Sequence, residues 1–353
     1  MRTDTWKAKL AILALAVTLI TPACATKKPM PTPTTPGATT PATTKVSAGM
    51  VTDVGGLTDK SFNEAAWNGL QQLEKEKGAK VKAVESKRQE DYEPNIATMV
   101  DGGFNIIWGI GFLMGDAITA SATKYPNQKF GLIDAEATGN NVASILFKEH
   151  EGSFLMGIMA AKTSKSKKVG FVGGMDIPVI KRFEAGFKAG VQSIDPSVTV
   201  LTVYSGSFTD PGKGKDVALN MINQGADVIY HAAGSTGEGA IEAAKEKKVF
   251  AIGVDKDQNS LAPDTVISSM IKRVDLATHD YSLKAAEGGF VGGKSTILGL
   301  KEEGVGYAAT TKWDQMPAGT KELVDKWATA IKEGKVAVPG DLEALKTFKA
   351  PSL

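Results

Sequence analysis

Short apolar runs alternate with amphipathic stretches along the chain from Lys45 onward. Apolar runs of this length favour buried strands, and stretches with apolar positions three and four residues apart favour helices. The first series predicts strands at residues 46–51, 80–84, 106–109, 129–133 and 142–146, and helices at 62–77, 92–102, 113–124 and 152–162. This alternation is typical of a parallel sheet that is covered by helices on both faces.

A second series with the same rhythm begins at Val169. It predicts strands in GFVGG and at residues 198–204, 228–232 and 250–254, and helices at 179–193, 213–224 and 236–247. We therefore predict an α/β protein with two doubly wound, Rossmann-like lobes joined by a hinge. Residues 46–150 and about 271–300 are assigned to the first lobe and residues 151–270 to the second. The C-terminal segment 301–353, with a helix at 318–334, is not assigned to either lobe.

The first junction between a strand and a helix carries the first sign of a ligand site. Asp53 follows the apolar strand, and Gly55 and Gly56 then permit a tight turn. Phe62 and Asn63 open the helix that follows. Because ligands of open α/β sheets bind at the carboxyl ends of the strands, these residues are candidates for ligand binding.

Aspartates recur at the ends of strands in both predicted lobes. Asp53, Asp134 in FGLIDA and Asp255 in AIGVDKDQ each follow an apolar strand, so each carboxylate is expected at the same edge of its sheet. An aspartate after a strand often only caps the next helix or turn. Its repetition in both lobes favours a cleft on which the carboxylates converge.

Aromatic residues offer surfaces for a flat ligand. Phe62 stands among polar neighbours rather than on the apolar face of its helix, so it could stack on a ring or pack against the preceding loop. Phe183 and the adjacent Tyr230 and His231 are candidates for an opposing wall. A base held between two rings gains about 1–3 kcal/mol per stacked face.

Other polar motifs are open to a functional or a structural interpretation. GSTGEG at 234–239 could place backbone N–H groups near an anion, but it matches neither the Walker pattern nor GxGxxG and equally fits a tight turn. Lys272 could be a solvated lysine, or it could share ribose hydroxyls with Asp255. The chain's three histidines show no metal-ligand spacing, so we expect no metal.

The N-terminus predicts export. Basic residues precede an apolar run at residues 10–20, which has the length of a signal-peptide core. The single cysteine, Cys24, follows in LITPACAT, which resembles a bacterial lipobox although Thr21 stands where Leu or Val is usual. We expect residues 1–24 to be a lipoprotein signal peptide and lipid on Cys24 to anchor the protein extracytoplasmically to the bacterial membrane. The Thr- and Pro-rich segment 25–45 is typical of an extended tether.

A more specific indication comes from eight strings that occur in order. The strings are VTDVGGLTDKSFNEAAWNG, IIWGIGFLMGDA, FGLIDA, ILFKEHEGSFLMGIMAA, KVGFVGGMDIPVIKRFEAGFKAG, YHAAGSTGEGAIEAA, IGVDKDQ and SSMIKRVD. Together they resemble the basic membrane protein family. These are purine-nucleoside-receptor-like lipoproteins that serve ABC transporters, and the resemblance extends from Val46 to about Gly306. It implies the type I periplasmic binding protein fold and capture of guanosine, inosine or adenosine for delivery to a membrane permease.

The resemblance also implies roles on the base side of such a ligand. Phe62 would stack on the base, while Asn63 and Asp134 would hydrogen-bond its edge. The second stacking position is left open among three candidates, which are Phe183, Tyr230 and His231.

On the sugar side, the resemblance implies that Asp255 and Lys272 hold the ribose hydroxyls. Gly253 would present its backbone beside them, and Asp53 would line the cleft. Ligand capture by closure of the two lobes needs no chemical step. We therefore expect no catalytic residue and no cofactor.

Two alternative functions are an enzyme that acts on nucleosides and a sugar-binding protein of the same fold. A nucleoside hydrolase or phosphorylase would need a nucleophile or an acid–base pair, and the carboxylates show no distinctive catalytic spacing. A sugar-binding protein is the stronger rival, because it would keep the aspartates but would not need Asn63 and Asp134 at a base edge. The net charge of +2 and the export signal argue against a nucleic-acid partner, and we expect a monomer.

Overall fold

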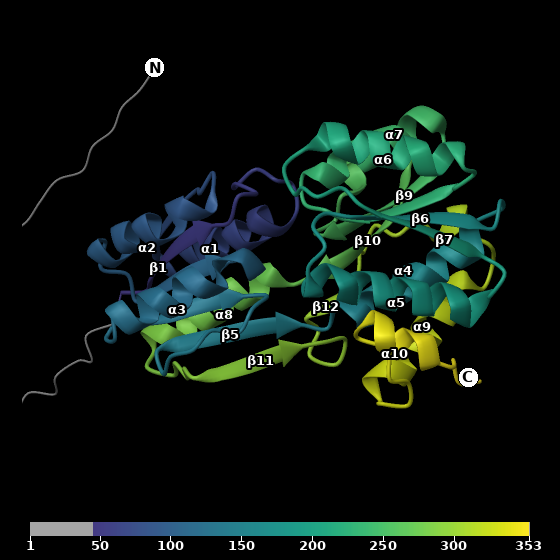
Figure 1. Cartoon of the computed structure of the whole chain (residues 1–353). Helices are drawn as coiled ribbons and strands as arrows, with labels where there is room; N and C mark the ends of the chain where they lie inside the picture. Colours follow the sequence, from purple (N-terminus) through teal and green to yellow (C-terminus); the bar gives the residue numbers. More distant parts are fainter. Residues whose placement is uncertain (1–44, 353) are drawn as a thin grey trace, which may run out of the picture. The chain divides into compact units, whose positions relative to one another are not determined.

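Two six-stranded sheets organise residues 45–352, the part of the chain that the computed structural model describes (Figure 1). The first sheet has the strand order β11-β5-β4-β3-β1-β2, and the second has the order β12-β10-β9-β8-β6-β7. Neighbouring strands pair in parallel except β10 and β12, which are antiparallel. The prediction of two doubly wound α/β lobes is confirmed. The expected signal peptide, Cys24 and most of the tether lie outside the described residues.

We call the first sheet and its helices lobe 1. Its strands are β1 (Ser47–Thr52), β2 (Lys80–Val84), β3 (Ile106–Ile110), β4 (Phe130–Ile133), β5 (Val142–Phe147) and β11 (Lys294–Leu298). Its helices are α1 (Phe62–Lys77), α2 (Tyr92–Asp101), α3 (Gly115–Lys124) and α8 (Val274–Ala286), with short turns η1 (Gln89–Asp91) and η2 (Phe112–Met114). Along β1, Met50 packs in the core that contains α1 residues, and Val51 packs in the core that contains α2 and α3 residues. Burial on both faces explains why the central strands β3 and β4 are nearly continuous apolar runs.

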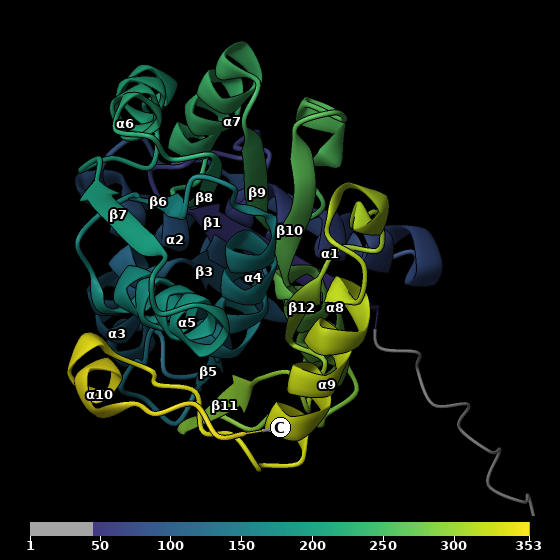
Figure 2. The ribbon, with the colours of Figure 1, turned by 90° about the vertical axis from the view of Figure 1, so that its right-hand side faces the viewer.

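The second sheet and its helices form lobe 2. Its strands are β6 (Lys168–Gly173), β7 (Thr199–Tyr204), β8 (Val228–Ala232), β9 (Phe250–Asp255), β10 (Val266–Lys272) and β12 (Val305–Tyr307). Its helices are α4 (Glu149–Thr163), α5 (Pro178–Ile194), α6 (Pro211–Asn223), α7 (Thr236–Lys247), α9 (Thr320–Lys332) and α10 (Leu342–Thr347), with turns η3 (Asn259–Leu261) and η4 (Trp313–Gln315). Helices α4 and α5 cover one face, and α6 and α7 cover the other (Figure 2). Helix α9, which sequence reasoning left unassigned, packs on α4, and α10 packs on α5.

The described chain crosses between the lobes three times. It leaves lobe 1 between β5 and α4, returns between β10 and α8, and leaves again between β11 and β12. The three crossings begin at strand ends, at Phe147, Lys272 and Leu298. The segments that follow β5, β10 and β11 therefore form the connection between the lobes.

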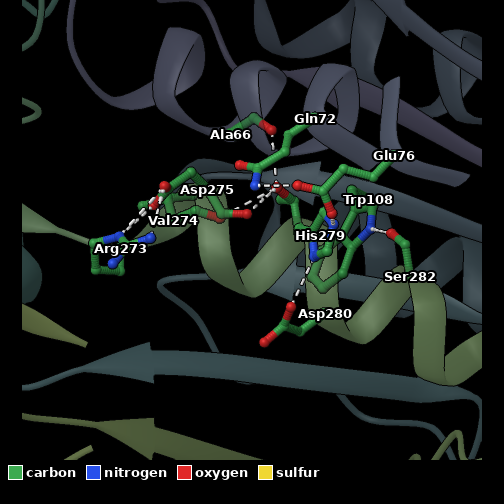
Figure 3. A network of polar contacts seen from close by, with 11 residues as sticks. Ala66, Gln72, Glu76, Trp108, Arg273, Val274, Asp275, His279, Asp280 and Ser282 are labelled. Carbon is green, nitrogen blue, oxygen red and sulfur yellow. Dashed lines mark hydrogen bonds and ion pairs between the residues drawn. The ribbon is translucent and has the colours of Figure 1, made fainter. Parts of the chain in front are cut away.

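Helix α8 is held against α1 and β3 by close contacts (Figure 3). A Cβ on Gly69 would lie 2.1 Å from the carbonyl oxygen of Asp275, so only glycine permits this approach of α1 to α8. Thr278 donates its hydroxyl hydrogen to the carbonyl of Ala66 at 2.8 Å. The buried indole of Trp108 donates to Ser282 Oγ at 2.8 Å. These contacts anchor the returning chain in lobe 1.

Candidate functional site

A cavity is lined by residues of both lobes. It lies at the carboxyl ends of β1 and β4 in lobe 1 and of β8, β9 and β10 in lobe 2, near the points where the strand order reverses. Ligands of doubly wound sheets bind at such points. The structure brings seven of the residues singled out in the sequence to this cavity, namely Asp53, Phe62, Asn63, Asp134, Phe183, Asp255 and Lys272.

The start of α1 fixes the orientation of Asn63. The carboxylate of Asp59 accepts three backbone N–H groups of the first turn at 2.9 to 3.0 Å, which satisfies donors that have no partner within the helix. Asn63 Nδ2 donates to Asp53 Oδ1 at 2.9 Å and to Asp59 Oδ2 at 3.3 Å. Both partners are acceptors, so the amide nitrogen faces them. The buried Asn63 Oδ1 has no hydrogen-bond partner among the described residues.

Lys272 stands in a buried charge cluster that joins the two lobes. Its Nζ lies 2.5 Å from Asp134 Oδ2 and 3.0 Å from Glu149 Oε1. Arg182 donates from Nε to the other oxygen of Glu149 at 2.6 Å. Burial alone would lower the pKa of Lys272, but Asp134 and Glu149 raise it, so the ammonium stays charged. Asp134 Oδ1 is buried and has no partner among residues 45–352.

The aspartates of the cavity are desolvated. Burial raises the pKa of Asp53 to about 6 and the pKa of Asp255 to about 7, although hydrogen bonds and, for Asp255, the charge of Lys272 act in the opposite direction. Burial also raises the pKa of Asp134. Ser61 donates its hydroxyl hydrogen to Asp255 Oδ2 across the lobes. The cavity therefore presents hydrogen-bond acceptors that water does not fully solvate.

Four phenylalanines line the cavity, and two of them were missed in the sequence. Phe62 and Phe183 were singled out, whereas Phe112 and Phe208 were not. Phe208 lies between β7 and α6 in SGSFTDP, an aromatic residue among polar neighbours just before a helix. Phe62 stands in a similar setting in DKSFNEA, so the same signal would have identified Phe208.

The structure does not bring three other candidates to the cavity. Tyr230 is fully buried and its hydroxyl lies 2.9 Å from Ser153 Oγ. His231 Nε2 lies 2.9 Å from Gln258 Oε1, and a Cβ on Gly253 would meet the Gln258 side chain at 2.6 Å. These residues precede the strand ends, so their side-chain positions face the covered surfaces of the sheet rather than the space beyond its edge. The cavity wall at this point is formed by Ala232, Ala233 and Gly234.

The match to a family model covers residues 46–339 and thus most of the chain. The model is that of the PnrA-like ABC transporter substrate-binding proteins. The chain belongs to this family. The resemblance noted in the sequence is thereby confirmed, and the family is a substrate-binding component of transporters rather than a family of enzymes. Substrate-binding proteins of ABC importers work outside the cytoplasm. None of the helices within residues 45–352 meets the length and hydropathy of a membrane span.

Relatives of this family member are similar over nearly their full length. A protein of Listeria monocytogenes named CD4+ T-cell-stimulating antigen is 38% identical over 82% of this chain and 87% of its own. The ABC transporter nucleoside-binding protein BmpA of Lactococcus lactis is 36% identical over 84% of this chain and 90% of its own. Basic membrane protein A of Borreliella burgdorferi is 35% identical over 83% and 88%.

Solved structures of solute-binding proteins share the fold. The ABC transporter solute-binding protein of Aeropyrum pernix superimposes with a TM-score of 0.77 and 32% identity, covering 86% of this chain and 96% of that one. A corresponding protein of Conexibacter woesei gives a TM-score of 0.69 at 23% identity, covering 84% and 99%. Both are two-lobe proteins of type I, which agrees with the two sheets found here.

Proposed function

We propose that this substrate-binding protein captures purine nucleosides in the interlobe cavity and delivers them to the permease of an ABC transporter. The observation that carries the proposal is the pair of unpartnered acceptors in the cavity wall, Asn63 Oδ1 and Asp134 Oδ1. A buried acceptor without a partner costs free energy, which a ligand N–H group relieves on binding. Guanine and hypoxanthine carry such groups on their edges.

The rings of the cavity suit the faces of a base. Phe62 comes from lobe 1 and Phe208 from lobe 2, so a flat ligand between them would contact both lobes. Stacking on aromatic side chains contributes about 1–3 kcal/mol per base. We assign the second stacking position to Phe208, with Phe183 as further apolar wall.

The sugar of the nucleoside is assigned to the side of the cavity near Asp255 and Lys272. The charge of Lys272 and the hydrogen bond from Ser61 favour the ionised form of Asp255, and an ionised carboxylate accepts hydrogen bonds from hydroxyl groups more strongly than a neutral group does. A ligand that bridges both lobes in this way stabilises their closed arrangement over the open one. The relative from Lactococcus lactis, named a nucleoside-binding protein, supports the same ligand class.

Titration calorimetry with inosine, guanosine, adenosine, hypoxanthine and ribose tests the proposal. We expect the nucleosides to bind with micromolar or tighter affinity, and the free base and ribose to bind at least about tenfold more weakly because each makes only part of the contacts. Mass spectrometry of ligand carried through purification provides an independent check. Ribose binding as tight as inosine binding would favour a sugar-binding protein instead.

We also propose that lipid on Cys24 anchors the protein at the outer surface of the bacterial membrane. The support is the position of this single cysteine at the end of the apolar run at residues 10–20. In a bacterial host, the wild-type chain is expected to incorporate a labelled fatty acid and to partition into detergent. Cys24→Ala should abolish both, and retention of the label in this variant would refute the anchor.

A further inference from the structure

His231, which the structure does not bring to the cavity, forms a buried polar pair with Gln258 in lobe 2. Gln258 follows β9 and is 1% exposed. Its Oε1 lies 2.9 Å from the backbone nitrogen of Val254 and 2.9 Å from His231 Nε2. Because the Val254 N–H group is a donor, the atom that it meets is the amide oxygen. His231 then donates from Nε2 to the same oxygen.

These two donors direct the other end of the Gln258 amide to lobe 1. Gln258 Nε2 donates to the backbone carbonyl of Lys60 at 3.0 Å, in the loop that leads into α1. The backbone N–H of Gln258 donates to Ser269 Oγ at 3.1 Å, which ties the residue to β10. Gln258 is thus fixed by contacts within lobe 2, and its amide nitrogen makes one contact across the lobes.

The surroundings of His231 keep its imidazole neutral, so that the ring donates one hydrogen bond, from Nε2. Burial lowers its pKa to about 4, so the imidazole is uncharged at neutral pH. A Cβ on Gly237 would lie 1.9 Å from His231 Nδ1, so only glycine at the start of α7 admits the ring. The histidine therefore holds the orientation of Gln258 rather than contacting the cavity.

The acceptor in lobe 1 occupies a restricted backbone conformation. Lys60 has a φ of 50°, in the left-handed region that residues with a Cβ rarely adopt. Such a conformation persists where surrounding contacts stabilise it. Lys60 is followed closely by Phe62, and Gln258 holds the backbone of Val254, so the contact joins two walls of the cavity.

We infer that Gln258 is a positioning residue for ligand capture, whose amide joins the end of β9 to the start of α1 and holds the lobes closed over the cavity. The inference rests on the proposed function only for the identity of the ligand, because the contact itself contains no ligand atom. Loss of the contact speeds opening of the lobes, and its effect falls mainly on the dissociation rate of the ligand.

Gln258→Glu and Gln258→Met separate the contact between lobes from the contacts within lobe 2. At pH 8, Gln258→Glu retains an acceptor for His231 and Val254 but places a carboxylate oxygen against the Lys60 carbonyl. Gln258→Met fills similar space and has no hydrogen bond to offer. Tritiated inosine is expected to leave both variants at least about tenfold faster, with an association rate changed less than about threefold.

A second measurement follows lobe closure directly. Spin labels are placed by Glu74→Cys on α1 and Lys245→Cys on α7, both exposed positions, in the full chain that carries Cys24→Ser. We expect both Gln258 variants to populate the short interlobe distance less than the wild type does, with and without inosine. Glu238→Gln is the matched control, because it removes the more exposed Lys60–Glu238 ion pair and should change either readout less than about twofold.

The outcomes distinguish the two proposals. If both variants keep the wild-type dissociation rate and closed population, the role of Gln258 is refuted, and thermal unfolding shows whether each variant is folded. If the wild type does not bind inosine, the proposed function fails. The closed population of the ligand-free chain still decides the role of Gln258 in that case.

Discussion

Asp134 and Asp255 occupy equivalent places in the two lobes. Asp134 follows β4 and Asp255 ends β9, which are the fourth strands of their lobes in chain order and hold corresponding places in the two sheets. Both have a left-handed backbone, with φ of 70° and 66°, that is uncommon outside glycine but tolerated by aspartate. Each lobe therefore contributes one carboxylate in a restricted conformation to the same cavity.

Removal of a stacking ring should weaken nucleoside binding selectively. Phe62→Ala and Phe208→Ala are each expected to reduce the affinity for inosine at least about tenfold, because a stacked base contributes about 1–3 kcal/mol. Calorimetry checks this, with Phe290→Ala as control because Phe290 does not line the cavity. An unchanged affinity in both variants would refute stacking.

The two unpartnered acceptors should favour 6-oxopurines. Guanosine and inosine carry an N1–H donor for Asn63 Oδ1 or Asp134 Oδ1, whereas the N1 of adenosine is itself an acceptor. We expect both to bind about tenfold more tightly than adenosine, the scale of one hydrogen bond to a buried group. 1-Methylinosine is the matched ligand, since it differs from inosine at this donor. Equal affinities for inosine and 1-methylinosine would contradict the assignment.

Asp134→Ala is expected to reduce the affinity for inosine at least about tenfold, as measured by calorimetry.

Lys272 should be important for stability as well as for binding. Lys272→Met leaves Asp134 and Glu149 without their shared cation in a buried site, and breaking such a pair costs about 3–5 kcal/mol. Urea unfolding of the ligand-free protein measures the loss. Lys321→Met on the exposed pair with Asp325 is the control and should cost less than about 1 kcal/mol. Similar losses of unfolding free energy in both variants would show that the buried cluster contributes no more to stability than an exposed ion pair does.

The buried Asp255 predicts a pH dependence of stability. Its pKa is raised by burial from 3.8 to about 7, so between these values the folded state binds a proton that the unfolded chain has released. The free energy of unfolding therefore decreases as the pH rises through this window. Asp255→Asn should flatten the profile measured by urea unfolding between pH 4 and pH 8, whereas Asp264→Asn at an exposed site should not. A wild-type slope in Asp255→Asn would disprove the assignment.

The contact of α1 with α8 depends on Gly69. Gly69→Ala places a Cβ about 2 Å from the Asp275 carbonyl, which forces the helices apart and should cost about 1–3 kcal/mol or more of unfolding free energy. Gly306→Ala is a matched control, because nothing lies within 4 Å of the added Cβ. Thermal and urea unfolding compare the two. Stability of Gly69→Ala at the level of Gly306→Ala would show that α8 adjusts freely.

The apolar pattern of the sequence predicted the lobes well because strands buried on both faces leave a strong signal. The predicted helix at 62–77 has the bounds of α1, and the predicted strand at 80–84 has those of β2. Strands β10, β11 and β12 were missed. β10 is buried, but Ser268 and Ser269 interrupt its apolar run. β11 is half exposed and lacks an apolar run, and β12 is only three residues long, so each depends on pairing with a distant strand.

The candidate site was predicted where a residue stands just beyond a strand. Asp134 and Asp255 could be found in this way because the ends of parallel strands share one edge. Tyr230 and His231 precede the end of β8, and a difference of one or two residues moves a side chain from the cavity to a covered face of the sheet. Phe208 was missed because it lies in a loop after β7, and no carboxylate directly follows that strand.

The sequence by itself determined the two doubly wound lobes, the family and the strand-end residues, because periodicity and local motifs act over short stretches of chain. Only the tertiary structure decided which residues meet. The contact of Lys272 with Asp134 and Glu149 and the contact of Gln258 with Lys60 join residues more than a hundred positions apart. Such contacts depend on how the lobes close and which rotamers fit, and no local pattern specifies either.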